Sequence, residues 1–444
     1  MDKRKKKKII ILGLCIGLVA LLGVYLGLFA DREAPPFEIS EVYSLPLGED
    51  EKAYVQRVIV SDLTGDGRKE VLASYDVYSY VEKKVEGASG ATLLFKEARV
   101  LILASDAGGN FQKLWEYDSG LTRQNVAVGD FDGDGKPDLV IGGVIIEDVG
   151  DSSASVTSRV EVLLQRENGG FDKVFASDIG EFFWPGLIEA GDFDGDGRTD
   201  SIVGGLAAGN ESPYPAYLFR NRGAGNFTMY PIALRQGVIV MGMWKADINN
   251  DGSPDLIIRA TDRDTEISSL ILLLNDGAGE FEFRELDVSP NVIVIEDFIG
   301  NEYPDVVFTK SGQVGDEVYF LRNEQGEFAE PKPIGILSEG QSTRMISADF
   351  NNDNTLDVLL LEEDVGFRED LGRFETDITG HLLLIRDNDE LSFTWEWSHN
   401  FLEEREISSS QHATVAADIN DDGWTDLILV FGGGEVYLAL NQHT

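Results

Sequence analysis

The sequence predicts an all-β fold, a seven-bladed β-propeller with four-stranded blades, preceded by one transmembrane helix. Three observations predict it: a nine-residue acidic motif that occurs seven times, four short apolar strands around each copy, and one uncharged stretch near the N-terminus. The copies start 50 to 69 residues apart. Self-similarity at such a period is typical of arrays of small units, none of which can bury its apolar face alone.

The N-terminal region predicts a membrane anchor. Residues 1–8 are a basic cytoplasmic tail that contains KRKKKK, residues 9–30 carry no charge, and residues 31–36 form a short linker. A helix of about 22 residues with a rise of about 1.5 Å per residue spans a hydrocarbon core of about 30 Å. Because flanking lysines favour a cytoplasmic N-terminus, we expect a single-pass membrane protein. Its propeller, residues 37–444, would then lie outside the cytoplasm, at the cell surface or in the periplasm.

A cleaved signal peptide that ends at Ala30 is the alternative to an anchor. The apolar run is longer than the usual secretory length of about 7 to 15 residues, and Leu28 is a poor match to the small residue expected there, so the sequence favours the anchor. Two G-x-x-x-G spacings within the run allow weak self-association through the helix. Cys15 is the only cysteine, so the exported part has no disulfide.

The chain is strongly acidic, with 79 Asp and Glu residues, 37 Lys and Arg residues and a net charge of −42. A surface of this sign repels phosphate backbones, which excludes nucleic acid as a natural partner. The acidic residues either form a solvated surface or are partly neutralised by bound cations.

The acidic motif has the composition of a calcium-binding loop. In the second copy, DFDGDGKPD, carboxylates occupy positions one, three, five and nine, and Gly133 and Gly135 permit the sharp turn between them. Oxygen ligands at short, flexible spacing suit Ca²⁺, which takes about six to eight of them. Zinc or copper would require His or Cys, which the loops lack, and magnesium requires stricter octahedral geometry.

Six of the seven loops keep the ligand positions. Positions one, three, five and nine would contribute side-chain oxygens, and position seven its backbone carbonyl. The predicted metal ligands are Asp62, Thr64, Asp66, Arg68, Glu70, Asp130, Asp132, Asp134, Lys136, Asp138, Asp192, Asp194, Asp196, Arg198, Asp200, Asp247, Asn249, Asp251, Ser253, Asp255, Asp349, Asn351, Asp353, Thr355, Asp357, Asp418, Asn420, Asp422, Trp424 and Asp426. In the fifth loop, 297–305, Ile299 takes position three and Asn301 position five, so we predict that this loop is empty.

Asp-Gly clusters also occur simply as turns, and this is the structural alternative to a metal site. Six aligned copies favour calcium. At positions one, three, five and nine the six loops carry 20 acidic side chains, which would repel one another strongly without a cation. We therefore expect about six Ca²⁺ ions to staple the cysteine-free exported part.

Each loop is flanked by short apolar strands in a fixed order. One strand enters the loop, a second leaves it, a third follows, and a Gly-x-Phe turn leads into a fourth, as at 109–111, 225–227, 279–281 and 326–328. Four antiparallel strands per repeat predict a propeller blade. The seventh repeat stops after its third strand, so we expect residues 37–47 to supply its outer strand and close the ring.

These loops and turns resemble the FG-GAP, or VCBS-type, repeats of integrin alpha-subunit propellers and of many exported microbial proteins, over about residues 37–444. The resemblance implies a calcium-binding, seven-bladed propeller used for extracellular recognition or cell adhesion. The chain departs from integrins in placing its span at the N-terminus, with no leg domains after the propeller. Partnership with a beta subunit is therefore not carried over.

Insertions point to the face on which a ligand would bind. Long connections between the second and third strands are expected at 75–97, 145–158, 207–214 and 361–380, all on the face opposite the acidic loops. Loops elaborated on one face of a rigid scaffold usually mark the binding face. Aromatic residues on this face include Tyr75, Tyr78, Tyr80 and, in the connection from blade two to blade three, Phe182, Phe183 and Trp184. The last three either contact a ligand or pack between blades.

No catalytic motif accompanies the repeats. The four histidines are scattered, and the chain has no nucleophile elbow, phosphate loop or zinc motif. We expect a membrane-anchored, extracytoplasmic, calcium-binding module that recognises a protein or glycan ligand, not an enzyme. Two alternatives stay open: a propeller-borne polysaccharide hydrolase or lyase, and a scaffold subunit of a cell-envelope complex.

Overall fold

The computed structural model describes most of the predicted propeller. The described residues are 37–48, 51–85, 88–105, 111–148, 154–181, 183–207, 215–223, 225–235, 237–313, 315–337, 341–368, 373–388, 390–401 and 412–442. The predicted tail, membrane span and linker, at 1–8, 9–30 and 31–36, lie outside them. Within the described ranges, no helix is long and apolar enough to cross a membrane.

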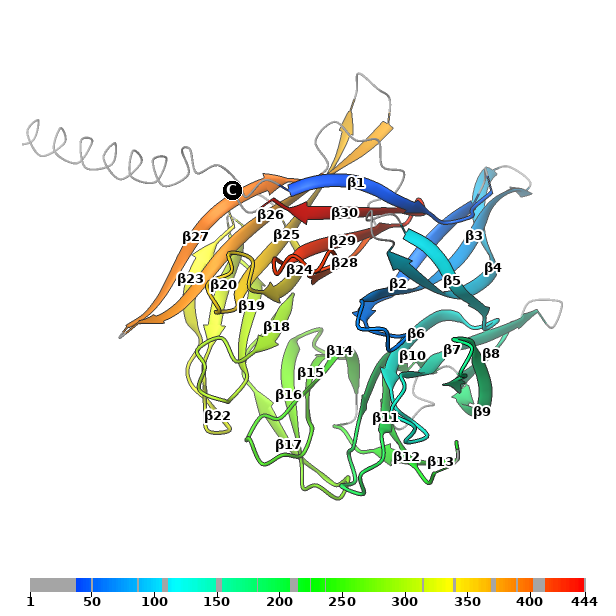
Figure 1. The fold of residues 1–444 in the computed structure, drawn as a ribbon, viewed down its shortest axis with the longest axis horizontal. Helices are drawn as coiled ribbons and strands as arrows, with labels where there is room; N and C mark the ends of the chain where they lie inside the picture. Colours follow the sequence, from blue (N-terminus) through cyan, green and yellow to red (C-terminus); the bar gives the residue numbers. More distant parts are fainter. Residues whose placement is uncertain are drawn as a thin grey trace, which may run out of the picture.

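Seven four-stranded antiparallel sheets stand around a common centre (Figure 1), which confirms the predicted all-β, seven-bladed propeller. Blade 1 contains β2 (Glu51–Ser61), β3 (Glu70–Val85), β4 (Ala88–Ser105) and β5 (Phe111–Asp118), and blade 2 contains β6 (Thr122–Gly129), β7 (Asp138–Asp148), β8 (Ala154–Gln165) and β9 (Phe171–Glu181). Blade 3 contains β10 (Phe183–Gly191), β11 (Asp200–Ala207), β12 (Ala216–Asn221) and β13 (Phe227–Ile232), and blade 4 contains β14 (Val238–Ala246), β15 (Asp255–Asp262), β16 (Ser268–Asn275) and β17 (Phe281–Leu286).

The remaining blades follow the same order. Blade 5 contains β18 (Ile293–Glu296), β19 (Asp305–Ser311), β20 (Asp316–Leu321) and β23 (Lys332–Ile336), with a small ribbon of β21 (Asn323–Glu324) and β22 (Glu327–Phe328). Blade 6 contains β24 (Gln341–Ala348), β25 (Asp357–Arg368), β26 (Arg373–Asn388) and β27 (Glu390–Asn400). Blade 7 contains β28 (His412–Ala417), β29 (Asp426–Phe431), β30 (Glu435–Asn441) and, from the other end of the chain, β1 (Phe37–Ser44).

The ring closes as the sequence predicts. β1 lies beside β30, with Phe37 opposite Asn441 and Ser44 opposite Glu435, and so forms the outer strand of blade 7 (Figure 1). This pairing covers the edge that β30 would otherwise present to solvent and to other chains.

Two details of the predicted connections are wrong. The expected insertions at 75–97, 145–158 and 361–380 are not loops, because the second and third strands continue as paired hairpins as far as Val85 opposite Ala88, Asp148 opposite Ala154 and Arg368 opposite Arg373. Continued ladder pairing satisfies backbone groups that a loop would leave to water. The turn at 326–328 leads into β22, and the fourth strand of blade 5 begins only at Lys332. Residues 208–214, and the turn glycine at 109, lie outside the described residues.

The hydrophobic core is shared between neighbouring blades. One cluster joins Val140 and Val162 of blade 2 to Val203 and Phe219 of blade 3, and another joins blade 7 to blade 1. Each sheet therefore buries its faces against its neighbours, as expected for units that cannot bury an apolar face alone.

We expect Phe37→Ala to lower the free energy of unfolding by about 3 kcal/mol, since truncating a buried Phe costs about 3 to 5 kcal/mol. Phe37 is 8% exposed, and its ring centroid lies 5.7 Å from that of Phe401 in blade 6. Glu41→Ala, at an exposed position of the same strand, should change stability by less than about 0.5 kcal/mol. Chemical denaturation followed by tryptophan fluorescence measures both, and equal midpoints for the two variants would contradict a role for β1 in closure.

Candidate functional site

All seven acidic loops have the same backbone. The residues at positions four and six adopt left-handed conformations with φ between 55° and 88° in every loop: Gly65, Gly67, Gly133, Gly135, Gly195, Gly197, Asn250, Gly252, Gly300, Glu302, Asn352, Asn354, Asp421 and Gly423. Glycine, asparagine and aspartate tolerate this region best, which explains the composition of the motif. The fifth loop adopts it as well, with Glu302 at φ 70°.

The first and fifth positions hold the turn through backbone amides. Asp130 Oδ2 accepts the Gly135 N–H at 2.9 Å, and Asp134 Oδ1 accepts the Lys136 N–H at 2.9 Å. In the fifth loop, Asp297 Oδ2 accepts the Glu302 N–H at 2.8 Å by the same bond. Carboxylate side chains that accept backbone N–H groups therefore stabilise the turn in these loops.

The ninth position carries a buried acid. Asp200 is 0% exposed, and its two oxygens accept the Phe193 N–H at 3.0 Å and the Asn221 N–H at 2.7 Å. Burial, the largest effect, raises the pKa of this carboxyl in loops one to five and seven, although the N–H donors lower it in part. The pKa reaches about 6 for Asp138, Asp200, Asp255 and Asp426, and about 7 for Asp305.

In blades 2 to 5 and 7, an amide side chain at the end of the third strand connects the ninth-position acid to the preceding blade. Asn275 donates its backbone N–H to Asp255 Oδ1 at 2.6 Å and its side-chain Nδ2 to the Phe193 carbonyl, in the loop of blade 3, at 3.0 Å. The same arrangement recurs at Asn221, Asn323 and Asn441, and Gln165 takes this place in blade 2. Sequence reasoning missed these residues, although an amide at the end of the third strand was a visible signal.

Loops two and three bring three carboxylates together. One oxygen from each member of Asp130, Asp132 and Asp138, and likewise of Asp192, Asp194 and Asp200, lies within 4.8 Å of the others. The fifth-position carboxylates turn aside; Asp134 Oδ2, for example, accepts from Lys136 Nζ at 2.7 Å. Asp194 Oδ1 is buried with no hydrogen-bond partner among the described residues. A cation bound by this oxygen would offset the cost of burying it unpaired. This set of hard oxygen donors suits Ca²⁺.

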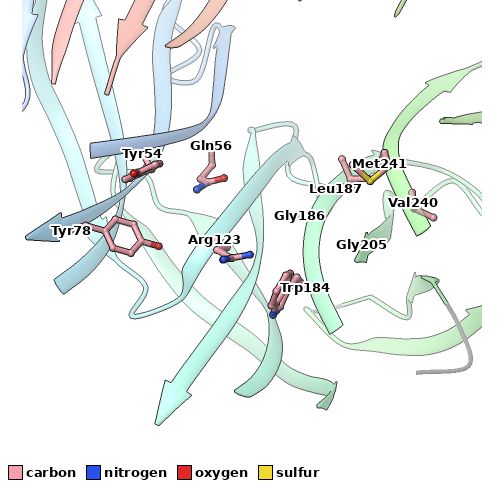
Figure 2. A pocket seen from close by; sticks show the side chains of 10 residues that line it. All are labelled: Tyr54, Gln56, Tyr78, Arg123, Trp184, Gly186, Leu187, Gly205, Val240 and Met241. Atoms are coloured by element: carbon pink, nitrogen blue, oxygen red, sulfur yellow. The ribbon is translucent and has the colours of Figure 1, made fainter. Parts of the chain in front are cut away.

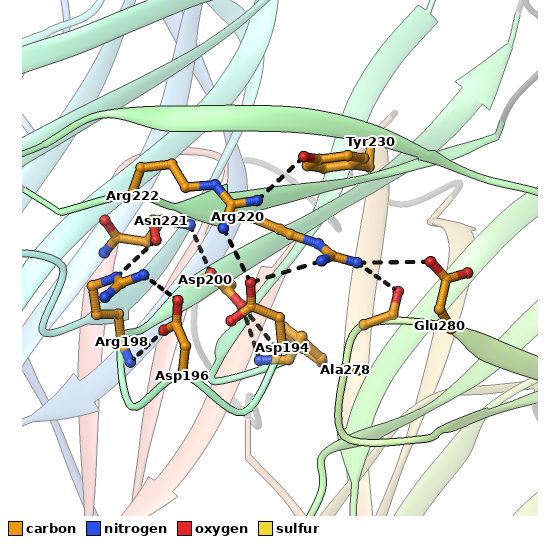
Figure 3. Close-up of polar contacts among 12 residues, drawn as sticks. Asp194, Asp196, Arg198, Asp200, Arg220, Asn221, Arg222, Tyr230, Ala278 and Glu280 are labelled. Atoms are coloured by element: carbon orange, nitrogen blue, oxygen red, sulfur yellow. Dashed lines mark hydrogen bonds and ion pairs between the residues drawn. The ribbon is translucent and has the colours of Figure 1, made fainter.

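The third loop also has arginines beside its carboxylates (Figure 3). Arg222 Nη1 lies 3.5 Å and Arg220 Nη1 3.9 Å from Asp194 Oδ2, and Arg198 pairs with Asp196. Arg220 also lies over the Tyr230 ring at 4.7 Å. These guanidinium groups partly neutralise the loop from the protein itself.

The other loops place an amide, a hydroxyl or an apolar group at position three. Thr64, Asn249, Asn351 and Asn420 occupy it in loops one, four, six and seven, and within the described residues these loops hold no group of three converging acids. Ile299 occupies it in loop five and packs against the apolar cluster around Phe298. Position-seven residues donate their backbone N–H to position five, as Ser253 does to Asp251 at 2.8 Å.

The face opposite the loops has a pocket of about 610 Å³ near the ends of strands in blades 1 to 4 (Figure 2). It is lined by Tyr54, Gln56, Tyr78, Arg123, Trp184, Gly186, Leu187, Gly205, Val240 and Met241. We call it the Arg123 pocket. Of the predicted aromatic residues, Tyr78 and Trp184 line it, whereas Tyr75 is 1% exposed in the core between blades 1 and 7. The side chains of Tyr80, Phe182 and Phe183 lie outside the described part.

A buried aspartate beneath the pocket holds several of its lining residues. Asp76 Oδ2 accepts the Arg123 backbone N–H at 2.6 Å, the Tyr78 hydroxyl at 3.4 Å and Gln56 Nε2 at 3.3 Å. Asp76 is 0% exposed, and burial raises its pKa to about 6. The Arg123 guanidinium stacks over the Trp184 ring at 4.2 Å, so Trp184 contributes to the pocket wall.

Comparison with known proteins finds one repeat family and several relatives. The FG-GAP-like repeat model matches residues 62–141 and 297–360, which include four of the seven acidic loops. Integrin alpha-V of Gallus gallus is 27% identical over 233 residues, 47% of this chain and 20% of that protein. A T-cell immunomodulatory protein homolog of Plasmodium yoelii yoelii is 29% identical over 133 residues, 26% of this chain and 19% of that protein. The matches thus span about a fifth of each relative.

Among solved structures, the exotype rhamnogalacturonan lyase YesX aligns with a TM-score of 0.48 at 13% identity, over 94% of this chain and 76% of that chain.

We expect Asn275→Ala to destabilise the fold by about 1 to 3 kcal/mol, because the buried Phe193 carbonyl loses its side-chain donor. Gln112→Ala, at an exposed position of β5, is the control and should have little effect. Denaturation midpoints measured with a chelator present isolate the hydrogen bond from metal binding. Equal midpoints would show that the asparagine does not link the blades.

Proposed function

Because the chain carries FG-GAP-like repeats on a seven-bladed propeller, we propose that it is a calcium-stabilised recognition module that binds an extracellular protein or glycan. The observation that carries this proposal is the position of the Arg123 pocket. It lies on the face remote from the acidic loops, and its Trp, Tyr and Arg side chains are those that dominate recognition surfaces.

In this proposal, bound calcium would stabilise the acidic loops and so the folded propeller. Carboxylates of positions one, three and nine would hold it in loops two and three, and the equivalent oxygens would hold it in loops one, four, six and seven. Bound Ca²⁺ would supply positive charge and oxygen coordination to acids that are costly to bury unpaired. Loop five would hold none, since Ile299 offers no side-chain oxygen.

The location belongs to the same proposal. The uncharged residues 9–30 would anchor the chain, with the propeller outside the cytoplasm. A relative named integrin alpha-V is consistent with an extracellular role.

Binding is favoured over catalysis by the lining of the Arg123 pocket. None of its ten described lining residues is His, Asp, Glu, Lys or Cys, the groups that most often serve as acid, base or nucleophile. A polysaccharide lyase or hydrolase and an envelope scaffold remain the alternatives. Turnover of an acidic polysaccharide would support the enzyme, and stoichiometric capture by an envelope complex would support the scaffold.

Calcium should saturate at about six ions per chain, and its removal should lower the thermal midpoint, because ligands that bind only the folded state stabilise it. Asp132→Ala in loop two should reduce the number of bound ions by one. Glu302→Ala removes an exposed acid from loop five and should leave the number unchanged. Equilibrium dialysis and thermal denaturation with and without chelator measure both effects; an unchanged midpoint on chelation would refute the role of calcium.

Ligand binding should depend on the face remote from the loops. An array of extracellular proteins and glycans, probed with the full chain in calcium, should identify ligands whose capture is lost with Trp184→Ala. Trp424→Ala, a matched tryptophan change at position seven of an acidic loop, should retain capture. Loss of thermal stability together with binding in Trp184→Ala would instead assign that ring to packing between blades.

A further inference from the structure

We propose that the Arg123 pocket binds a segment of a partner protein that presents one carboxylate beside an apolar side chain, with the carboxylate on the Arg123 guanidinium. This inference rests on the proposed recognition function and names the class of its ligand. Four features lead to it: the backbone bulges, a guanidinium without an ion pair among the described residues, the composition of the lining, and the acidity of the whole chain.

The first strands of blades 1 to 4 each contain a β-bulge at the same level. Pairing shifts by one residue between Val55 and Arg57, between Thr122 and Asn125, between Trp184 and Leu187, and between Val240 and Gly242. The residues within these bulges include Gln56, Arg123, Gly186 and Met241, and all four line the pocket. The first strand of blade 6 has the same one-residue shift, between Ser342 and Arg344, so the bulge recurs around the ring. In blades 1 to 4 the bulges bring residues from four strands to one pocket.

Arg123 is held in a strained conformation with its charge available. Its φ is 54°, a left-handed value that is costly for a residue with a side chain and tends to occur at functional sites. The Asp76 carboxylate fixes its backbone N–H at 2.6 Å. Among the described residues, its guanidinium makes the stacking contact with Trp184 but no hydrogen bond or ion pair.

A stacked guanidinium of this kind is pre-oriented for a carboxylate. Arginine can donate two parallel N–H bonds to the two carboxylate oxygens, and stacking on an aromatic face leaves its N–H edges free to do so. Arg123 is the only charged side chain among the ten lining residues, so the pocket offers one cation and requires one anion.

The rest of the lining favours a peptide as the source of that anion. In Figure 2, Tyr54 and Tyr78 lie on one side of Arg123, and Leu187, Val240 and Met241 lie across the pocket from them. Tyr, Trp, Arg and Met are enriched in the centres of protein interfaces, where Lys, Glu, Asp and Ser are depleted. The apolar side would accept a side chain next to the carboxylate. A net charge of −42 opposes polyanionic ligands such as acidic polysaccharides.

The test uses labelled, capped pentapeptides of sequence Ala-Leu-X-Phe-Ala, in which X is Asp, Glu, Asn or Gln. Binding to the full chain in detergent, at constant calcium, is followed by fluorescence anisotropy. The acidic peptides should bind at least about tenfold more tightly than their amide counterparts, since an ion-paired hydrogen bond is lost in the amides. Arg123→Gln keeps the backbone bond to Asp76 and should abolish this preference, whereas Arg123→Lys should retain a weaker one.

Arg284→Gln, at a half-buried position of β17 outside the pocket, is the control and should leave the preference unchanged. Equal binding of acids and amides, no binding of any acidic peptide, or a preference that survives Arg123→Gln would each overturn the inference. Arg123-dependent binding of glucuronic or N-acetylneuraminic acid alone would assign the pocket to acidic sugars and refute the peptide ligand. Ligands captured by the array but insensitive to Arg123→Gln would leave the recognition function standing and this inference refuted.

Discussion

The propeller depends on a buried carboxylate at the ninth position of each acidic loop. Asp200 binds the second residue of its own loop, Phe193, and the third strand of its own blade at Asn221. The Asn221 amide then crosses to the Phe131 carbonyl of the preceding loop at 2.7 Å. Asp255 with Asn275 and Asp426 with Asn441 repeat this arrangement. Hydrogen bonds therefore connect each of these loops to the third strand of its own blade, and that strand to the preceding loop. They lie on the same face as the predicted metal ligands.

The residues that hold the backbone of a loop in shape are only partly the same as those proposed to bind metal. Loop five keeps the first-position bonds, the left-handed turn and the bond from the Asn323 N–H to Asp305 Oδ1, although Ile299 replaces the third side-chain oxygen. Asp305 Oδ2 accepts no hydrogen bond among the described residues, because the Phe298 N–H donates to the Glu296 carbonyl instead. Asp305 therefore still fixes the third strand of its blade through Asn323, and positions three and five are what distinguish loop five from the loops proposed to bind calcium. Burial raises the pKa of these acids, and a bound cation would lower it by favouring the charged carboxylate.

The sequence was sufficient for features that repeat locally. Seven acidic motifs, strand order and the closing strand all follow from periodicity within about 50 to 70 residues, and the structure confirms them. The asparagine bonds were out of reach because Asn275 and its partner Phe193 lie 82 residues apart, in different blades. The bulges were also missed, because a bulge is a property of two paired strands rather than of one. The sequence predicts loops at 75–97 and 361–380, where the structure has hairpins. The strand ends that extend past the rest of the blade lack the alternation of apolar and polar residues by which a strand is recognised.

The bulges also explain how the two faces can differ in function. Between each bulge and its loop the first two strands keep one register, which places the residue before position one opposite position nine, as with Gly191 and Asp200. Beyond the bulge the register shifts, away from the carboxylate network. Residues such as Arg123 and Met241 can therefore be re-aimed without moving the buried acids that hold the ring. The register at the loop face is thus independent of the residues that face the pocket. The left-handed conformation of Arg123 is held by the Asp76 carboxylate, which accepts its backbone N–H, and by the register of β6 and β7 on either side of the bulge.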